Sequence, residues 1–240
     1  HLRPRRQRQM CIRDRVIAFA SMLMLFLSCE QNDVSITVPD NPPVAKSVEY
    51  SVTFSFDWNK NDFPTDYPAN PHFSPLVGWV HQKGNGFFNT GKTATDGIKS
   101  MAEFGSTTTL VRELQALIDQ SKSLKTYVGS GLSGGVGTIS LDVMVSSEFS
   151  AVSLVTMLAP SPDWYIGCAN VVLTDANGEF VATKTIRGNV YDAGTDNGAT
   201  FAAANSVSSP RENIKIITQP PLGNGTEVPA SICSITFTKK

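Results

Sequence analysis

Histidine, cysteine and long apolar runs are scarce in this chain of 240 residues. It holds three histidines and four cysteines, and His72 and His81 are the only histidines beyond residue 15. No further ligand set or nucleophile motif accompanies them. This scarcity argues against a transition-metal centre and against a Ser-His catalytic pair. We therefore expect both histidines to serve packing or hydrogen bonding.

The longest apolar run, residues 16–28, is too short to span a bilayer. It ends at Cys29 in Phe26-Leu27-Ser28-Cys29, which resembles the lipobox of bacterial lipoproteins. An ordinary signal peptide is the alternative. Residues 29–46 are polar and contain three prolines, as suits a flexible linker. We expect an exported protein that Cys29 anchors at the outer membrane or cell surface. Anchoring on the periplasmic face of the membrane is an alternative.

Residues 1–15 are basic, but we do not expect them to belong to the protein. Residues 10–14, Met-Cys-Ile-Arg-Asp, are what ATG-TGT-ATA-AGA-GAC encodes, and this matches a sequencing adapter. The segment carries six arginines and one aspartate, so the formal net charge falls from −1 to about −6 without it. An acidic remainder argues against a nucleic-acid partner and suits cation binding.

Residues 47–240 are predicted to form one mostly β domain. Apolar and polar residues alternate in several segments, as is typical of half-buried strands. Helical periodicity is confined to residues 97–104 and 107–120, after the first strand. Because strands and helices do not alternate, we expect an antiparallel β-sandwich with one or two short helices. The expected strands are 50–56, 139–145, 153–158, 165–173, 180–186, 214–217 and 232–238.

Three aspartates form the most suggestive cluster: Asp163 in Ser-Pro-Asp-Trp, and the pair Asp192 and Asp196 in Tyr-Asp-Ala-Gly-Thr-Asp. Hard divalent cations take several oxygen ligands, and Ca²⁺ tolerates carboxylates mixed with loop carbonyls and water. Carboxylates forced together need a cation or a shared proton. The pattern favours a calcium site. Ordinary turn chemistry, in which aspartate bonds its own backbone, is the alternative.

Two long motifs, residues 159–167 and 191–198, resemble the spondin domain of F-spondin and mindin. Weaker matches in 63–81 and 97–105 precede them, in the order that the family has. The resemblance implies a β-sandwich with one Ca²⁺ held by loops, through Asp163, Asp192 and Asp196. The family can add an acidic ligand from the preceding strand. An ungapped alignment places Met144 there, so Asp142, two residues away, is the fourth candidate.

Residues 86–93 match the phosphate-loop pattern G-x-x-x-x-G-K-T. A true phosphate loop follows the first strand of a parallel βαβ unit and needs a later acidic strand end for Mg²⁺. The sequence predicts neither. We therefore expect no bound nucleotide.

Cys168 and Cys233 are the two cysteines of the predicted domain. Cys168 shares strand parity with Ile166, and Cys233 with Ile235 and Phe237, so both thiols are expected in the core. In an oxidising compartment they can form a disulfide or stay free, and the sequence leaves both open.

Three functions fit these features. The first is a calcium-binding, non-catalytic adhesion or recognition domain with an extracellular protein or glycan as ligand. The second is a calcium-dependent carbohydrate-binding module, with aromatic residues near the loop stacking on sugars. The third is a hydrolase that uses the aspartates and Ca²⁺ as an electrophile; it ranks last because no base or nucleophile is identifiable. The aromatic candidates are Trp58, Trp79, Trp164 and Tyr191.

Overall fold

The computed structural model describes residues 46–120 and 122–240. The predicted adapter segment (1–15), export signal (16–28) and lipidated Cys29 lie outside the described residues. Within the described part, no helix is long and apolar enough to cross a membrane.

The first sheet has four antiparallel strands in the order β5-β1-β11-β8. The long strand β1 lies in its middle and pairs with β5 on one side and β11 on the other. Tyr50, Val52 and Phe54 of β1 point into the core, while the residues between them are half-buried. This alternation predicted the strand. The bounds are β1 (Ser47–Asp57), β5 (Val136–Ser146), β8 (Thr183–Arg187) and β11 (Cys233–Lys239).

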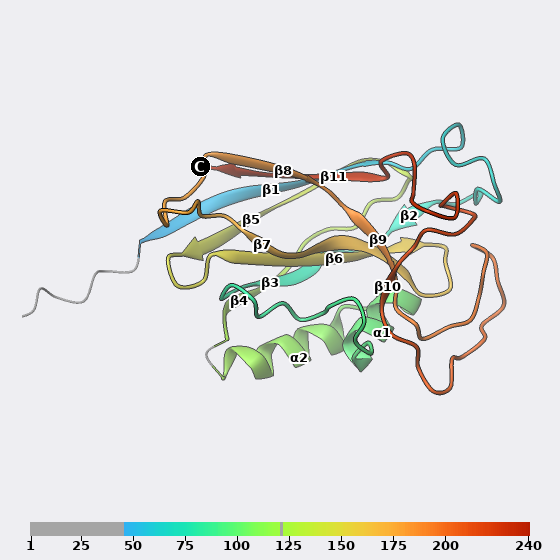
Figure 1. Ribbon diagram of the computed structural model, residues 1–240, viewed down its shortest axis with the longest axis horizontal. Helices are drawn as coiled ribbons and strands as arrows, with labels where there is room; N and C mark the ends of the chain where they lie inside the picture. The colour runs from blue at the N-terminus through green and yellow to red at the C-terminus, as the bar shows by residue number, and fades with distance from the viewer. Residues whose placement is uncertain (1–45, 121) are drawn as a thin grey trace, which may run out of the picture. The chain divides into compact units, whose positions relative to one another are not determined.

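The second sheet has seven strands in the order β10-β9-β7-β6-β3-β4, with β2 also paired to β6. It packs face to face with the first sheet in Figure 1, and residues from both sheets form one buried cluster between them. The predicted antiparallel β-sandwich is confirmed. The bounds are β2 (His72–Phe73), β3 (Val77–His81), β4 (Ser123–Val128), β6 (Ala151–Ala159), β7 (Trp164–Val172), β9 (Asn189–Asp192) and β10 (Lys215–Ile216).

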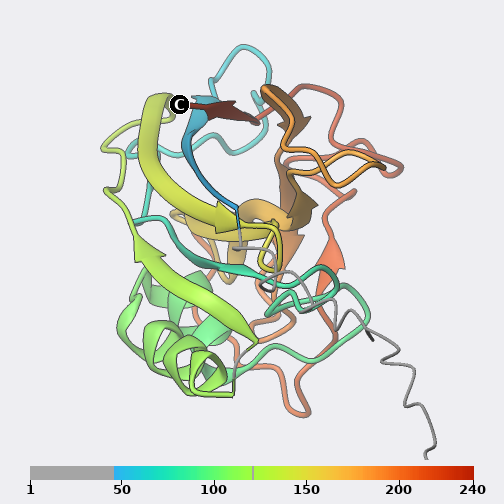
Figure 2. The same cartoon turned by 90° about the vertical axis from the view of Figure 1, so that its left-hand side faces the viewer.

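Two helices, α1 (Asp96–Phe104) and α2 (Thr108–Ile118), cover the outer face of the seven-stranded sheet and bury a second core there (Figure 2). The side chain of Thr95 caps α1 by accepting from the N–H of Ile98. Glu113 of α2 accepts from the N–H of Gly97 at 2.8 Å, so the second helix also caps the first. Both helices lie within two residues of the predicted ranges, although they follow β3 and not the first strand directly.

Strand β3 was missed from the sequence, and its burial explains why. All five of its residues are buried, because one face meets the first sheet and the other meets the helices. A strand covered on both faces shows no alternation of apolar and polar residues. Strands β2, β4 and β9 were also missed; β9 is the strand that carries Asp192.

Candidate metal centre

Strand pairing brings Asp163 and Asp192 to the same end of the second sheet. Asp163 immediately precedes β7, and Asp192 is the last residue of β9. In the antiparallel pairing, Trp164 lies opposite Asp192, and Asp192 lies opposite Lys215 of β10. The two predicted motifs, nearly thirty residues apart in the chain, therefore meet at neighbouring strand ends.

The carboxylate of Asp163 is fully buried, and its two oxygens differ in their hydrogen-bond partners. Oδ2 accepts hydrogen bonds from the backbone N–H of Thr195 at 2.7 Å, from that of Asp196 at 3.1 Å and from the Thr195 hydroxyl at 3.2 Å. Oδ1 is buried and has no hydrogen-bond partner. A buried acceptor without a partner is costly, because it has lost water and gained nothing.

Burial, and then the neighbouring charge of Asp192, raise the pKa of Asp163 to about 6. The donors from Thr195 and Asp196 act in the opposite direction and lower this pKa. The sum indicates that three donors do not compensate the buried negative charge. A cation beside Oδ1 would supply the missing compensation.

Asp192 is also mostly buried, and burial raises its pKa. Its Oδ1 accepts from the N–H of Gly194 at 2.7 Å, which is ordinary turn chemistry. Its Oδ2 lies 3.5 Å from the ammonium nitrogen of Lys215, whose cross-strand position the pairing fixes. Lys215 was not singled out in the sequence, and it is the cation that this site holds.

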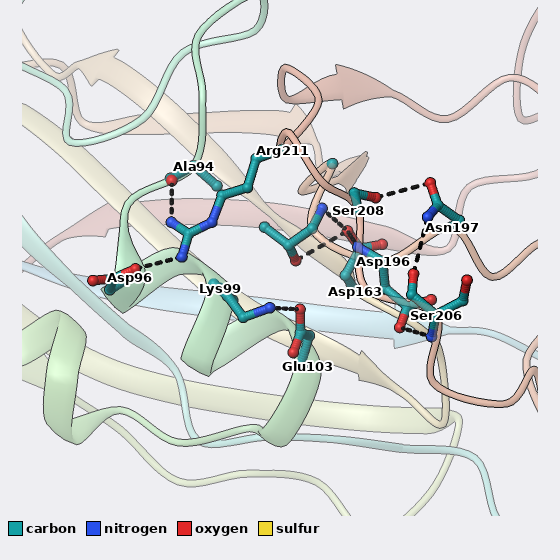
Figure 3. Close-up of polar contacts among 12 residues, drawn as sticks. Ala94, Asp96, Lys99, Glu103, Asp163, Asp196, Asn197, Ser206, Ser208 and Arg211 are labelled. Carbon is teal, nitrogen blue, oxygen red and sulfur yellow. Dashed lines mark hydrogen bonds and ion pairs between the residues drawn. The ribbon is translucent and has the colours of Figure 1, made fainter.

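The carboxylate of Asp196 is turned into its own loop. Its Oδ1 accepts from the N–H of Gly198 at 2.7 Å and its Oδ2 from the N–H of Ser206 at 2.8 Å (Figure 3). Turn chemistry therefore describes Asp196 as it stands, and it meets Asp163 through its backbone. At the far end of this loop, Arg211 donates to the carbonyl of Ala94 and to the Asp96 carboxylate, which ties the loop to α1.

Asp142 is not brought to this site. The strand that directly precedes Asp163 is β6, whereas Asp142 lies on β5 in the other sheet. Its exposed carboxylate is bound to the ammonium group of Lys240, next to the C-terminus, which Figure 1 places at the opposite end of the sandwich from β10. The candidate fourth ligand is therefore not brought to the other aspartates, because its strand belongs to the other sheet.

The remaining residues fit a hard cation in part. Across residues 46–120 and 122–240, no three side chains of His, Cys, Asp or Glu are grouped closely enough to hold a metal ion. Asp163 and Asp192 are nevertheless neighbours, with one oxygen of Asp163 unpartnered. Asp192 and Asp196 both line a cavity of about 480 Å³. A Ca²⁺ ion held here would need backbone carbonyls or water to complete six to eight ligands.

The four aromatic candidates offer no stacking surface for a sugar. Trp58, Trp79, Trp164 and Tyr191 are each at least 95% buried. Trp58 and Trp164 belong to the core between the sheets, and Trp79 and Tyr191 to the core under the helices. The expectation of exposed aromatics beside the loop is wrong.

Cys168 on β7 and Cys233 on β11 both belong to the core between the sheets, as their strand parity predicts. They are free thiols in the structure. Burial raises the pKa of Cys168 to about 12 and also raises that of Cys233. Both groups are therefore protonated and unreactive as they stand. Of the two states that the sequence leaves open, a disulfide and free thiols, the structure has the free thiols.

The segment that matches the phosphate-loop pattern has a structural use. The N–H of Gly91 donates to the carbonyl of Ile214 at 2.8 Å, and the N–H of Ile214 donates to the carbonyl of Lys92 at 2.9 Å. The segment follows β3, whose neighbours are antiparallel. It therefore supports the chain just before β10 and does not leave a parallel strand as a phosphate loop does.

His81 has the hydrogen-bonding role that the sequence predicts. Its Nδ1 lies 2.7 Å from the carbonyl of Gln82, so Nδ1 carries the proton. Its Nε2 lies 2.8 Å from the hydroxyl of Ser153, and this hydroxyl accepts from the N–H of Asn170. Both His81 and Ser153 are fully buried. This Ser-His pair braces the bulge between β6 and β7 and cannot reach a substrate. His72 is exposed.

The buried His81 gives the protein a specific pH dependence. Burial lowers the pKa of His81, so the folded state keeps it neutral where the unfolded chain, with a pKa of about 6.5, takes up a proton. Its stabilising contribution is present above pH 6.5 and is lost as the pH falls towards the folded pKa. We expect the free energy of unfolding of wild type, relative to His81→Gln, to shrink by up to about 1.4 kcal/mol per pH unit below 6.5. Urea titrations at several pH values measure this, and a constant difference would contradict it.

The architecture is an antiparallel β-sandwich with two helices on one face, and comparison with known proteins identifies the family. The family described as Spondin_N matches residues 48–224. The chain therefore belongs to the Spondin_N family, as the sequence motifs predict. Strand β11, which pairs with both β1 and β8, lies beyond the matched range, so the fold extends further than the match.

Individual relatives agree with the family. Spondin-2 of Homo sapiens is 29% identical over 174 residues, which are 71% of this chain and 52% of that protein. Spondin-1 of Gallus gallus is 30% identical over 203 residues, which are 79% of this chain and 25% of that protein. The chain thus spans about half the length of the first relative and a quarter of the second. The likeness concerns the shared domain and not the whole relatives.

Proposed function

We propose that this chain is a calcium-binding, non-catalytic recognition domain whose Ca²⁺ braces the loops that follow β9. One observation carries the proposal: Asp163 Oδ1 is fully buried and has no hydrogen-bond partner. Burial and the neighbouring charge of Asp192 both disfavour the ionised form of this carboxylate. A hard cation beside this oxygen would satisfy it. Asp163 and Asp192 are the central ligands of the proposal, and Asp196, which lines the same cavity as Asp192, is the third.

The proposal assigns the domain to adhesion or ligand recognition outside the cell. Membership of the Spondin_N family supports this role. Anchoring through Cys29 at the outer membrane or cell surface belongs to the same proposal, and it depends on the apolar run before that cysteine. Catalysis does not belong to it, because the Ser153-His81 pair is buried in the core. The partner is an extracellular protein or glycan that binds the loops held by Ca²⁺.

Calorimetric titration of the full chain with CaCl₂ tests the proposal. Wild type is expected to bind one ion and to melt at a higher temperature with Ca²⁺ than with chelator. Asp192→Ala is expected to lose most of the binding heat and of the melting shift. Asp142→Ala is the matched control, because this carboxylate lies on the other sheet. A wild type that shows neither heat nor shift would overturn the proposal.

A further inference from the structure

We propose that Lys215 is a built-in competitor of the cation, an ammonium group that Ca²⁺ must displace from Asp192. The inference rests on the proposed function and concerns how this chain sets its affinity. In this inference, a residue that is not itself a ligand lowers the Ca²⁺ affinity of the site.

The position of Lys215 carries the argument. Lys215 lies directly opposite Asp192 in the pairing of β9 with β10, so the two side chains lie next to each other on the same face of the sheet. Its ammonium nitrogen lies 3.5 Å from Asp192 Oδ2 and 2.9 Å from Glu212 Oε2. Both residues line the same cavity of about 480 Å³ as Asp192 and Asp196. An ammonium group therefore already lies beside Asp192, one of the two carboxylates that the calcium proposal uses.

The ammonium group compensates one of the two central carboxylates and leaves the other alone. Asp192 faces Lys215, whereas the fully buried Asp163 Oδ1 has no donor at all. A lysine provides one charge at one point, but a divalent cation can contact both carboxylates at once. A divalent cation therefore gains a contact with Asp163 Oδ1 that Lys215 does not make. To bind, it must first break the ion pair between Lys215 and Asp192.

The side chain of Lys215 keeps an ion-pair partner when Ca²⁺ displaces it from Asp192. Its side chain is 55% exposed, and Glu212, which it already contacts, is similarly exposed. The ammonium can leave Asp192 and keep Glu212 without any change in β10. Binding of Ca²⁺ then breaks one ion pair and leaves the ammonium charge a few ångströms from the ion. At that range, the repulsion between the two charges weakens binding by roughly three- to tenfold.

Two substitutions separate charge from shape. Lys215→Gln removes the competing charge and is expected to tighten Ca²⁺ binding by roughly three- to tenfold in calorimetric titration. Lys215→Arg keeps the charge and is expected to bind like wild type. Lys46→Gln is the matched control, because Lys46 also forms an exposed ion pair, with Glu179 at 2.8 Å, and is 57% exposed. It is expected to leave the affinity unchanged.

The outcomes distinguish this inference from the proposed function. If wild type binds Ca²⁺ and Lys215→Gln binds it equally or more weakly, Lys215 is no competitor, while the calcium proposal stands. Tighter binding by both Lys215→Gln and Lys46→Gln would also overturn the inference, since the effect would then come from overall charge. If neither wild type nor Lys215→Gln binds, the calcium proposal has failed and the inference fails with it.

Discussion

Replacing Asp163 by asparagine is expected to stabilise the calcium-free protein and to abolish its response to calcium. The raised pKa of about 6, against an ordinary 3.8, means that keeping this buried group ionised at neutral pH costs roughly 3 kcal/mol. Asparagine removes the charge and retains an oxygen to accept from Thr195 and Asp196. We expect Asp163→Asn to raise the free energy of unfolding in chelator by about 1 kcal/mol, because the amide oxygen accepts more weakly than a carboxylate and the NH₂ group, in the place of Oδ1, is buried without an acceptor.

Alanine at the same position is the contrasting variant. It leaves the backbone N–H groups of Thr195 and Asp196 buried without an acceptor, at about 1–3 kcal/mol each. Asp163→Ala is therefore expected to be the less stable of the two by several kcal/mol. Urea titration of both variants, with Ca²⁺ and with chelator, measures this. Equal destabilisation by both variants, with the calcium-dependent shift intact, would show that the Asp163 charge is not what the site is built around.

Substitution of Gly194 by alanine is expected to have the second large effect, because this residue lets the loop pass close to the backbone of Glu212. Gly194 has a φ of +71°, and an added Cβ would lie 2.5 Å from the carbonyl oxygen of Glu212. The left-handed backbone and the clash together are expected to cost about 2–4 kcal/mol. Because Gly194 also donates to Asp192, the shift of the loop is expected to weaken Ca²⁺ binding.

Gly178 provides the control for Gly194. It also has a positive φ, of +80°, but no atom lies within 4 Å of the position that a Cβ would take. Gly178→Ala is expected to cost only the backbone strain, about 1–2 kcal/mol, and to leave calcium binding unchanged. Thermal melting and calcium titration of the two variants separate strain from crowding. A Gly194→Ala variant no worse than Gly178→Ala in both measurements would show that the close approach to Glu212 is unimportant.

Local sequence was enough for the strands that have one covered face. The alternation in β1 and β5 appears in the structure where the pattern places it. It failed for β3, which is covered on both faces, because burial on both sides removes the alternation. The helices were recognisable because their apolar residues face one sheet only.

The candidate site divides in the same way. Asp163 and Asp192 could be predicted because each lies in a long recognisable motif. The orientation of the Asp196 carboxylate could not, because it depends on Ser206 at the other side of a loop. Asp142 was misplaced because no local pattern says which sheet a strand will join. Lys215 was predicted within a strand, but only the pairing of β10 with β9 shows that it faces Asp192.

A crystal structure of the full chain grown with excess Ca²⁺ at neutral pH tests the central claim most directly. The account predicts one ion in contact with Asp163 Oδ1 and the Asp192 carboxylate, at the 2.3–2.6 Å typical of Ca²⁺ and oxygen. Such an ion would give the buried oxygen the partner it lacks. A structure at the same calcium concentration with no ion there, and with Lys215 still paired to Asp192, would contradict the account.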